Sequence, residues 1–221
     1  MAQALVIGSS GGIGQALCDR LAAQGWQVTP LSRREHGLEI TDETSIRANL
    51  GALEGPFQRI LIVTGALEID GHAPEKALRH LSFDGLVQHF AVNTIGPALV
   101  MKHALRLLPR DEPSVLAAMS ARVGSIGDNR AGGWHSYRAA KAALNQIVRG
   151  AAIELGRTHR QAVCVALHPG TVATRFTEKY LGRHPAVPPS EAAANLLRVI
   201  DGLGPEASGQ FFDWAGKPVP W

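Results

Sequence analysis

Residues 4–14 read Ala4-Leu5-Val6-Ile7-Gly8-Ser9-Ser10-Gly11-Gly12-Ile13-Gly14. The first four form a short apolar run, which predicts a buried strand. The helical spacing of Ile13, Leu17 and Leu21 then predicts a helix over 12–24, ending before Gly25. Glycines between the two elements allow the backbone to turn tightly. The chain therefore opens with a strand, a glycine-rich turn and a helix.

The same alternation continues along the chain. Further strands are predicted at 28–31, 59–64, 115–119, 162–167 and 210–214, and helices at 83–108, 137–155 and 190–200, the last capped by Ser190. Strands that are apolar on both faces indicate a parallel sheet covered by helices on each side. The predicted fold class is α/β, a single Rossmann-type doubly wound parallel sheet forming one domain over residues 1–221.

One connection is too short for this pattern. Only residues 32–38 separate the second strand from Glu39, and a parallel crossover needs about a dozen residues or more. We expect residues 38–40 to form a loosely paired edge or a plain loop.

Composition limits the classes of function. The chain has 221 residues, 45% hydrophobic and 19% charged, which is ordinary for a globular protein and excludes disorder, collagen and coiled coil as descriptions of the whole. A net charge of +3 without a clustered basic stripe, and 5% aromatic residues, argue against nucleic-acid binding. Cys18 and Cys164 lack metal-ligand spacing, so we expect reduced thiols and no metal. No membrane span or signal peptide is evident, so we expect a cytoplasmic protein without a membrane partner.

The position of the glycine-rich turn favours a dinucleotide. Free N–H groups and the positive end of a helix attract a pyrophosphate, and glycines permit its close approach. The alternative is a simple glycine-rich turn. NAD sites place an acidic residue at the end of the second strand, whereas this chain has Ser32, Arg33 and Arg34 there. A guanidinium pairs with a 2′-phosphate, so NADP is favoured over NAD. We expect Arg33 to be the main contact and Ser32 to add a hydroxyl; the alternative is that both arginines are solvated.

Tyr137 and Lys141 are spaced i and i+4, which places them on one face of a helix. A free tyrosine has a pKa of about 10, and a nearby cation lowers that pKa toward the range of acid–base catalysis. The pair is weak evidence alone and gains weight from its context.

That context resembles the short-chain dehydrogenase/reductase family, and within it the small C-factor-like carbonyl reductase branch, over essentially the whole chain. The matching residues are Gly8, Gly12 and Gly14 of the glycine turn, Asn93 on the long helix, the Tyr137–Lys141 pair, the turn Pro169-Gly170-Thr171-Val172-Ala173-Thr174, and the ending from Phe211 to Trp221.

The resemblance implies hydride transfer between the C4 atom of a nicotinamide and a carbonyl or alcohol carbon. Tyr137 would exchange the proton, Lys141 would bind the ribose hydroxyls and keep Tyr137 acidic, and Asn93 would hold a water in a proton relay. The turn at 169–174 would lie against the nicotinamide. Further cofactor contacts are expected from Ser9, Ser10, Ile13, Thr64, Gly65, Ala66, Val172 and Thr174, and from Glu39 toward the adenine. We expect a small-molecule substrate and a homo-oligomer.

The chain departs from the family at the catalytic serine, where alignment places Ala121. Ser120 precedes that position and should point to the opposite face of its strand, while Ser125 lies 12 residues before Tyr137. Our hypothesis is that one of these two hydroxyls replaces the missing one. The departure keeps open an alternative, an NADP-binding regulatory or signalling protein with little turnover. Trp134 and the segment 176–187 are expected to wall the substrate site, and His135 and His168 to be polar loop residues.

Overall fold

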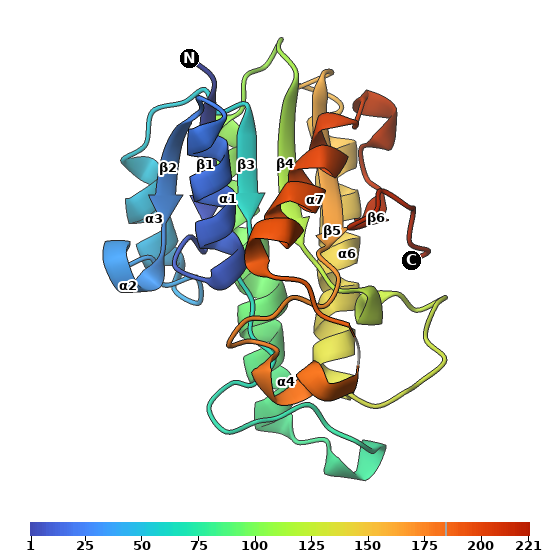
Figure 1. The fold of residues 1–221 in the computed structure, drawn as a ribbon. Coiled ribbons are helices and arrows are strands. Elements are labelled where there is room, and N and C mark those ends of the chain that lie inside the picture. The colour runs from blue at the N-terminus through green and yellow to red at the C-terminus, as the bar shows by residue number, and fades with distance from the viewer. Residues whose placement is uncertain (184) are drawn as a thin grey trace.

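The computed structural model describes residues 1–183 and 185–221. Its sheet contains β1 (Gln3–Ile7), β2 (Gln27–Leu31), β3 (Arg59–Ile62), β4 (Ser114–Met119), β5 (Ala162–His168) and β6 (Phe211–Asp213). All neighbours pair in parallel in the order β2-β1-β3-β4-β5-β6 (Figure 1). The predicted doubly wound parallel sheet is confirmed.

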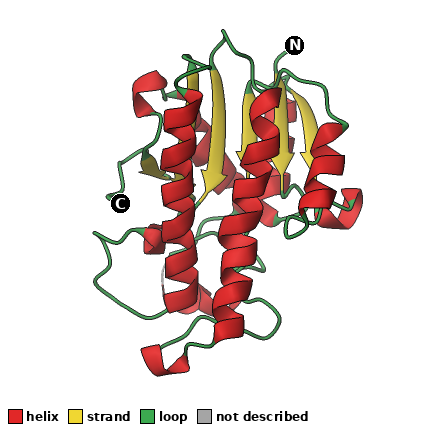
Figure 2. Ribbon diagram, turned by 180° about the vertical axis from the view of Figure 1, so that it is seen from behind, coloured by secondary structure: helices red, strands yellow, loops and turns green. Residues whose placement is uncertain are grey.

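Helices cover both faces of this sheet. They are α1 (Gly12–Ala23), α2 (Arg33–His36), α3 (Glu43–Gly51), α4 (Phe83–Phe90), α5 (Gly96–Ala104), α6 (His135–Leu155) and α7 (Pro189–Asp201). Alternating strand residues divide the core: Val6 and Leu61 pack with α1 and α7, whereas Leu5 and Ile60 pack with α3, α5 and α6. Figure 2, seen from behind, shows the second face covered by α6 and the α4–α5 segment.

The order of the strands reverses direction at β1. β2 pairs with one edge of β1 and β3 with the other. In such sheets the crevice beyond the carboxyl ends of the strands, where the winding reverses, is the preferred place for a ligand. The topology therefore predicts a ligand-binding site at the turns that follow β1, β3, β4 and β5.

The predicted continuous helix over 83–108 is wrong in its middle. The chain forms α4, a π-helical turn at Ala91–Ile95, α5 and a short 3₁₀ turn at Leu105–Leu107. Pro97 is four residues after Asn93 and has no N–H to donate to the Asn93 carbonyl, so the regular helical bond is lost there. The wide turn coincides with a residue expected to be functional, as π turns often do.

Other differences are smaller. Ser190 does not cap α7: it lies inside the helix, Pro188 is the N-cap residue and Pro189 occupies the first turn. Proline suits that position because its missing N–H would be unpaired anyway. Residues 38–40 form a plain loop, which was one of the two structures expected there. The short helices α2 and α3 were not predicted.

Candidate active site

A cavity of about 840 Å³ lies at the carboxyl ends of the strands. Its walls come from the glycine turn, the segments after β3 and β4, the first turns of α6 and the β5–α7 connection. It brings together the sequence-predicted residues Ser10, Gly12, Ile13, Gly14, Arg34, Thr64, Gly65, Ser120, Tyr137, Lys141, Pro169, Gly170, Val172 and Thr174. Eight other predicted residues do not line it: Gly8, Ser9, Ser32, Arg33, Glu39, Ala66, Asn93 and Ser125.

Several positions of the glycine turn have no room for any residue other than glycine. Gly8 has φ of 96°, a conformation that favours glycine, and its N–H donates to the Leu31 carbonyl at 2.8 Å. A Cβ on Gly14 would lie 2.2 Å from the Gly8 carbonyl oxygen, and a Cβ on Gly12 would lie 2.8 Å from Thr174 Cγ2. The turn is therefore packed tightly against both β1 and the segment after β5.

The same turn leaves hydrogen-bond donors for an anion. The first N–H groups of α1 have no acceptor within the helix, and Gly11 at the N-cap supplies no side chain. The buried hydroxyls of Ser9 and Thr64 have no partner among the described residues. Unpaired donors at a helix N-terminus beside a large cavity fit the pyrophosphate of a dinucleotide.

The residues after β2, which were expected to contact a ribose 2′-phosphate, are arranged differently from the expectation. Arg34, rather than Arg33, lines the cavity. Arg33 instead lies 3.6 Å from the Glu39 carboxylate, and Ser32 Oγ accepts the Glu35 N–H at 3.3 Å as the N-cap of α2. No carboxylate occupies the position at the end of β2 where NAD sites place one.

Tyr137 and Lys141 are both buried and lie side by side. The Lys141 ammonium donates to the Met119 carbonyl at 2.9 Å and lies 5.9 Å from the centroid of the Tyr137 ring. Burial raises the pKa of Tyr137 above its ordinary value and lowers the pKa of Lys141 to about 7. Without cofactor, burial therefore outweighs the expected effect of the cation, and Tyr137 holds its proton at neutral pH.

Asn93 lies behind the cavity wall, fully buried in the π turn. Its Oδ1 accepts the Ala66 N–H at 3.0 Å, and its Nδ2 donates to the Ala66 carbonyl at 2.9 Å. Nδ2 also lies 3.4 Å from Nδ1 of His89. Asn93 thus fixes the segment after β3, whose Thr64 and Gly65 line the cavity.

The two candidate serines are engaged elsewhere. Ser120 lines the cavity, but its hydroxyl donates to Asn145 Oδ1 at 2.6 Å, consistent with the predicted opposite face. The Ser125 hydroxyl donates to the Pro220 carbonyl and accepts the Asp128 N–H at 3.1 Å. The loop after β4 therefore turns Ser125 toward the C-terminal tail.

Aromatic side chains surround Tyr137, as expected for Trp134 and the segment 176–187, of which residue 184 lies outside the described residues. Ring centroids of Trp134 and Phe176 each lie 6.4 Å from that of Tyr137, and Trp134 lies 5.3 Å from Tyr180. All three line the cavity.

His168 differs from its expected place in a loop. It ends β5 and lines the cavity. Its Nδ1 has no partner among the described residues, and burial lowers its pKa to about 4.

Sequence reasoning missed two other buried groups near Tyr137, His89 and Glu75. The i and i+4 spacing of His89 and Asn93 was an available signal for the first. No local sequence pattern indicates Glu75. The fold brings its carboxylate to Ser136, which lies 61 residues later in the chain.

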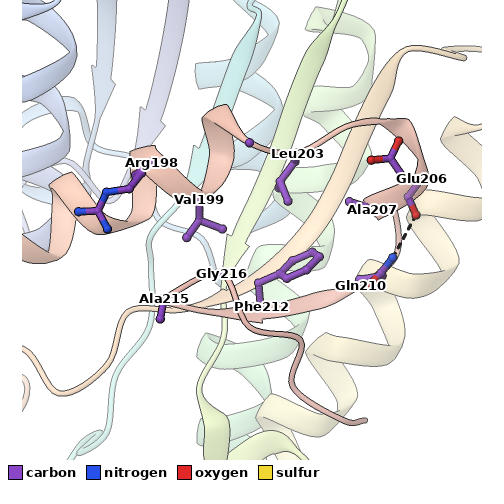
Figure 3. A pocket seen from close by; sticks show the side chains of 10 residues that line it. Arg198, Val199, Leu203, Glu206, Ala207, Gln210, Phe212, Ala215 and Gly216 are labelled. Carbon is purple, nitrogen blue, oxygen red and sulfur yellow. Dashed lines mark hydrogen bonds between the residues drawn. The ribbon is translucent and has the colours of Figure 1, made fainter.

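A second hollow, of about 470 Å³, lies between α7 and β6. Figure 3 shows Gln210 bound to Glu206, while Arg198 points away from the other labelled side chains. Arg198 donates to Asn195 Oδ1 at 2.7 Å. This hollow contains none of the predicted catalytic or cofactor-binding residues, although Phe212, Ala215 and Gly216 of the segment 211–221 line it.

Over residues 1–183 and 185–221, no cluster of three or more His, Cys, Asp or Glu side chains could hold a metal ion. Within the same ranges, every helix is too short or too polar to cross a membrane.

Comparisons with known proteins agree with this geometry. A family model described as short chain dehydrogenase matches residues 2–183. The chain is 32% identical over 204 residues to 1-hydroxy-2-glutathionyl-2-methyl-3-butene dehydrogenase of Rhodococcus sp. (strain AD45), covering 91% of this chain and 83% of that protein. It is 37% identical over 145 residues to C-signal of Myxococcus xanthus, covering 66% and 84%.

Solved structures show the same fold. An NADPH-bound carbonyl reductase from chicken fatty liver has a TM-score of 0.81 at 22% identity, covering 100% of this chain and 94% of that one. An NADP-bound short-chain dehydrogenase/reductase from Burkholderia multivorans has a TM-score of 0.80 at 23% identity, covering 100% and 99%. With the family model matching most of the chain, the protein belongs to the short-chain dehydrogenase/reductase family and is an oxidoreductase by type.

Proposed function

We propose that residues 1–221 form one NADP-binding unit that reduces a carbonyl group on a small molecule, or oxidises the corresponding alcohol. The observation that carries the proposal is the shared cavity: Tyr137 and Lys141 line the same space as the glycine turn and the segment 169–174. A bound nicotinamide dinucleotide supplies the hydride, which the side chains of this chain cannot.

The chain's own residues manage the proton. Tyr137 is protonated at neutral pH, since burial raises further a pKa that is already above neutral, and it donates its phenolic proton to the carbonyl oxygen. Lys141 binds the ribose hydroxyls with its ammonium and supports Tyr137 electrostatically. Asn93 holds the segment after β3 in place through Ala66. In this proposal Asn93 would also hold a water, from which a proton returns to Tyr137 by way of Lys141.

The proposed cofactor is NADP rather than NAD. Arg34 lines the cavity, and its exposed guanidinium, 3.0 Å from the Glu35 carboxylate, is the proposed contact of a 2′-phosphate. The exposed side chain of Arg33, which pairs with Glu39, is the proposed second contact. Contacts from Gly8, Ser9, Ser32 and Glu39 are part of the same proposal. The two structural neighbours described above bind NADPH and NADP, which agrees with this proposal.

The substrate's oxygen needs a second donor where the family has serine. Of the two candidates, Ser120 borders the cavity, and its hydroxyl would have to leave Asn145 to serve. Ser125 would have to leave Pro220. Single Ser→Ala variants test both, and unchanged turnover in each removes serine from the proposal.

A second candidate function is an NADP-binding regulatory or signalling protein with little turnover. Ala121 favours it, because the family's serine is missing there, and one relative bears the name C-signal. Purified protein, NADPH and a panel of aldehydes, ketones and quinones separate the two. Turnover that Tyr137→Phe abolishes supports the enzyme; tight cofactor binding without turnover of any carbonyl supports the regulator.

We also propose that the protein forms a homo-oligomer in the cytoplasm. Exposed apolar side chains on α4 and α6, including Phe83, Val87 and Ile153, support pairing with a second copy. Cys18 and Cys164 are free thiols, which suits a reducing compartment. Light scattering that gives the mass of one chain would contradict the oligomer.

A further inference from the structure

The connection between β3 and α4 contacts three separate parts of the site. Its Ala66 is bound to Asn93. Its Glu68 accepts the Tyr180 hydroxyl at 3.0 Å and pairs with Lys179, both in the segment after β5. Its Glu75 reaches the start of α6, immediately before Tyr137.

Glu75 holds the start of α6 through both its side chain and its backbone. One carboxylate oxygen accepts the Ser136 N–H at 3.1 Å, and the other accepts the Ser136 hydroxyl. The Glu75 carbonyl accepts the Trp134 N–H at 2.5 Å. Ser136 is fully buried and Glu75 is 9% exposed, so these bonds form away from solvent.

Helix α6 has no cap of its own. Its N-cap residue is Trp134, in the left-handed region with φ of 53° and ψ of 39°, and the side chain makes no capping bond. The first turn also carries no acidic residue. A carboxylate accepts hydrogen bonds from free N–H groups and interacts favourably with the positive end of a helix. Here it comes from Glu75, 61 residues earlier in the chain.

The surroundings keep this carboxylate charged. Burial acts to raise the pKa of Glu75, but the Ser136 bonds, a backbone bond and the nearby imidazole of His89 leave its pKa below the ordinary value. His89 is 1% exposed and packs edge-on against Tyr137, with ring centroids 6.0 Å apart. His89 and Glu75 thus form the buried support behind the Tyr137 side chain.

We propose that Glu75 is a positioning residue, which caps the catalytic helix from a distant loop and thereby sets the places of Tyr137 and Trp134. The inference rests on the proposed function for its kinetic consequence. Glu75 does not line the cavity, so its side chain acts through Ser136 rather than on substrate. Its removal should lower kcat and leave the KM for NADPH unchanged.

The test compares Glu75→Ala, Glu75→Gln and a matched control. Asp42→Ala removes the cap of α3, where Asp42 Oδ1 accepts the Thr44 N–H at 2.8 Å, so it removes a comparable cap elsewhere. Displacing a reacting group by about 1 Å can cost about 100-fold in rate. We expect Glu75→Ala to lower kcat at least about tenfold, Glu75→Gln to recover part of that loss by accepting the Ser136 N–H, and Asp42→Ala to keep the wild-type kcat.

Amide hydrogen exchange over residues 135–138 gives a readout that needs no turnover. Faster exchange there in Glu75→Ala, with the lowered kcat, supports the proposal. Wild-type kcat or wild-type exchange in that variant overturns it, and so does an equal loss of kcat in Asp42→Ala. If Glu75→Ala does not fold, wild-type exchange and kcat in Glu75→Gln overturn it instead. An inactive wild-type protein contradicts the proposed function alone, because the exchange result still decides whether Glu75 caps the helix.

Discussion

The buried ammonium of Lys141 should make the stability of the protein depend on pH in a defined way. Its pKa is lowered from 10.5 to about 7 by burial. The unfolded chain therefore keeps this proton up to about pH 10.5, whereas the folded protein releases it near pH 7. Between these values the unfolded state binds more protons, so the free energy of unfolding rises with pH.

The size of the effect follows from the shift. One pKa unit corresponds to about 1.4 kcal/mol, so Lys141 should add about 3–4 kcal/mol to the free energy of unfolding between pH 7 and pH 10. Lys141→Met keeps most of the side-chain volume and removes the titration. The free energy of unfolding of the wild type minus that of Lys141→Met should therefore rise by this amount between pH 7 and pH 10.

Urea unfolding of cofactor-free protein at pH 7, 8, 9 and 10 measures this difference. Tyr137, Cys18 and Cys164 have pKa values raised by burial and lower the stability at high pH, but they are present in both proteins and largely cancel. A difference that stays flat, or falls with pH, would contradict a pKa of Lys141 lowered by burial.

Three other changes have defined outcomes. Gly14→Ala places a Cβ 2.2 Å from the Gly8 carbonyl oxygen, so NADPH affinity measured by fluorescence titration should fall at least about tenfold; wild-type affinity would contradict the packed turn. Asn93→Ala leaves both Ala66 backbone groups unpaired and should lower the urea-unfolding free energy by about 2–5 kcal/mol; a loss under about 1 kcal/mol would show that water replaces the amide. Arg34→Ala should raise the KM for NADPH about tenfold and leave that for NADH unchanged; equal changes for both cofactors would remove the 2′-phosphate from its role.

Much of the fold was predictable because its signals are local. Runs such as Ile60–Ile62 are apolar on both faces, which is typical of a strand in a sheet covered by helices on each side. The glycine turn and the i and i+4 spacing of Tyr137 and Lys141 are also short-range patterns, and the structure brings them to one cavity.

What sequence reasoning missed depends on contacts between distant segments or on one residue's chemistry. Pro97 does signal the break at Asn93, but the helical periodicity around it hid the signal. The engagement of Ser125 depends on the C-terminal tail, 95 residues away at Pro220. No local sequence pattern indicates the role of Glu75, because its partner Ser136 lies 61 residues away and is brought to it by the fold.

In the proposed function, the Tyr137 hydroxyl faces the reactive carbon of a nicotinamide held by the glycine turn. A crystal structure with NADP and a bound carbonyl compound tests it most directly. We expect the pyrophosphate at the N-terminus of α1, and the carbonyl oxygen within hydrogen-bond distance of the Tyr137 hydroxyl. A nicotinamide bound away from Tyr137, or a carbonyl oxygen held by other groups, would contradict it.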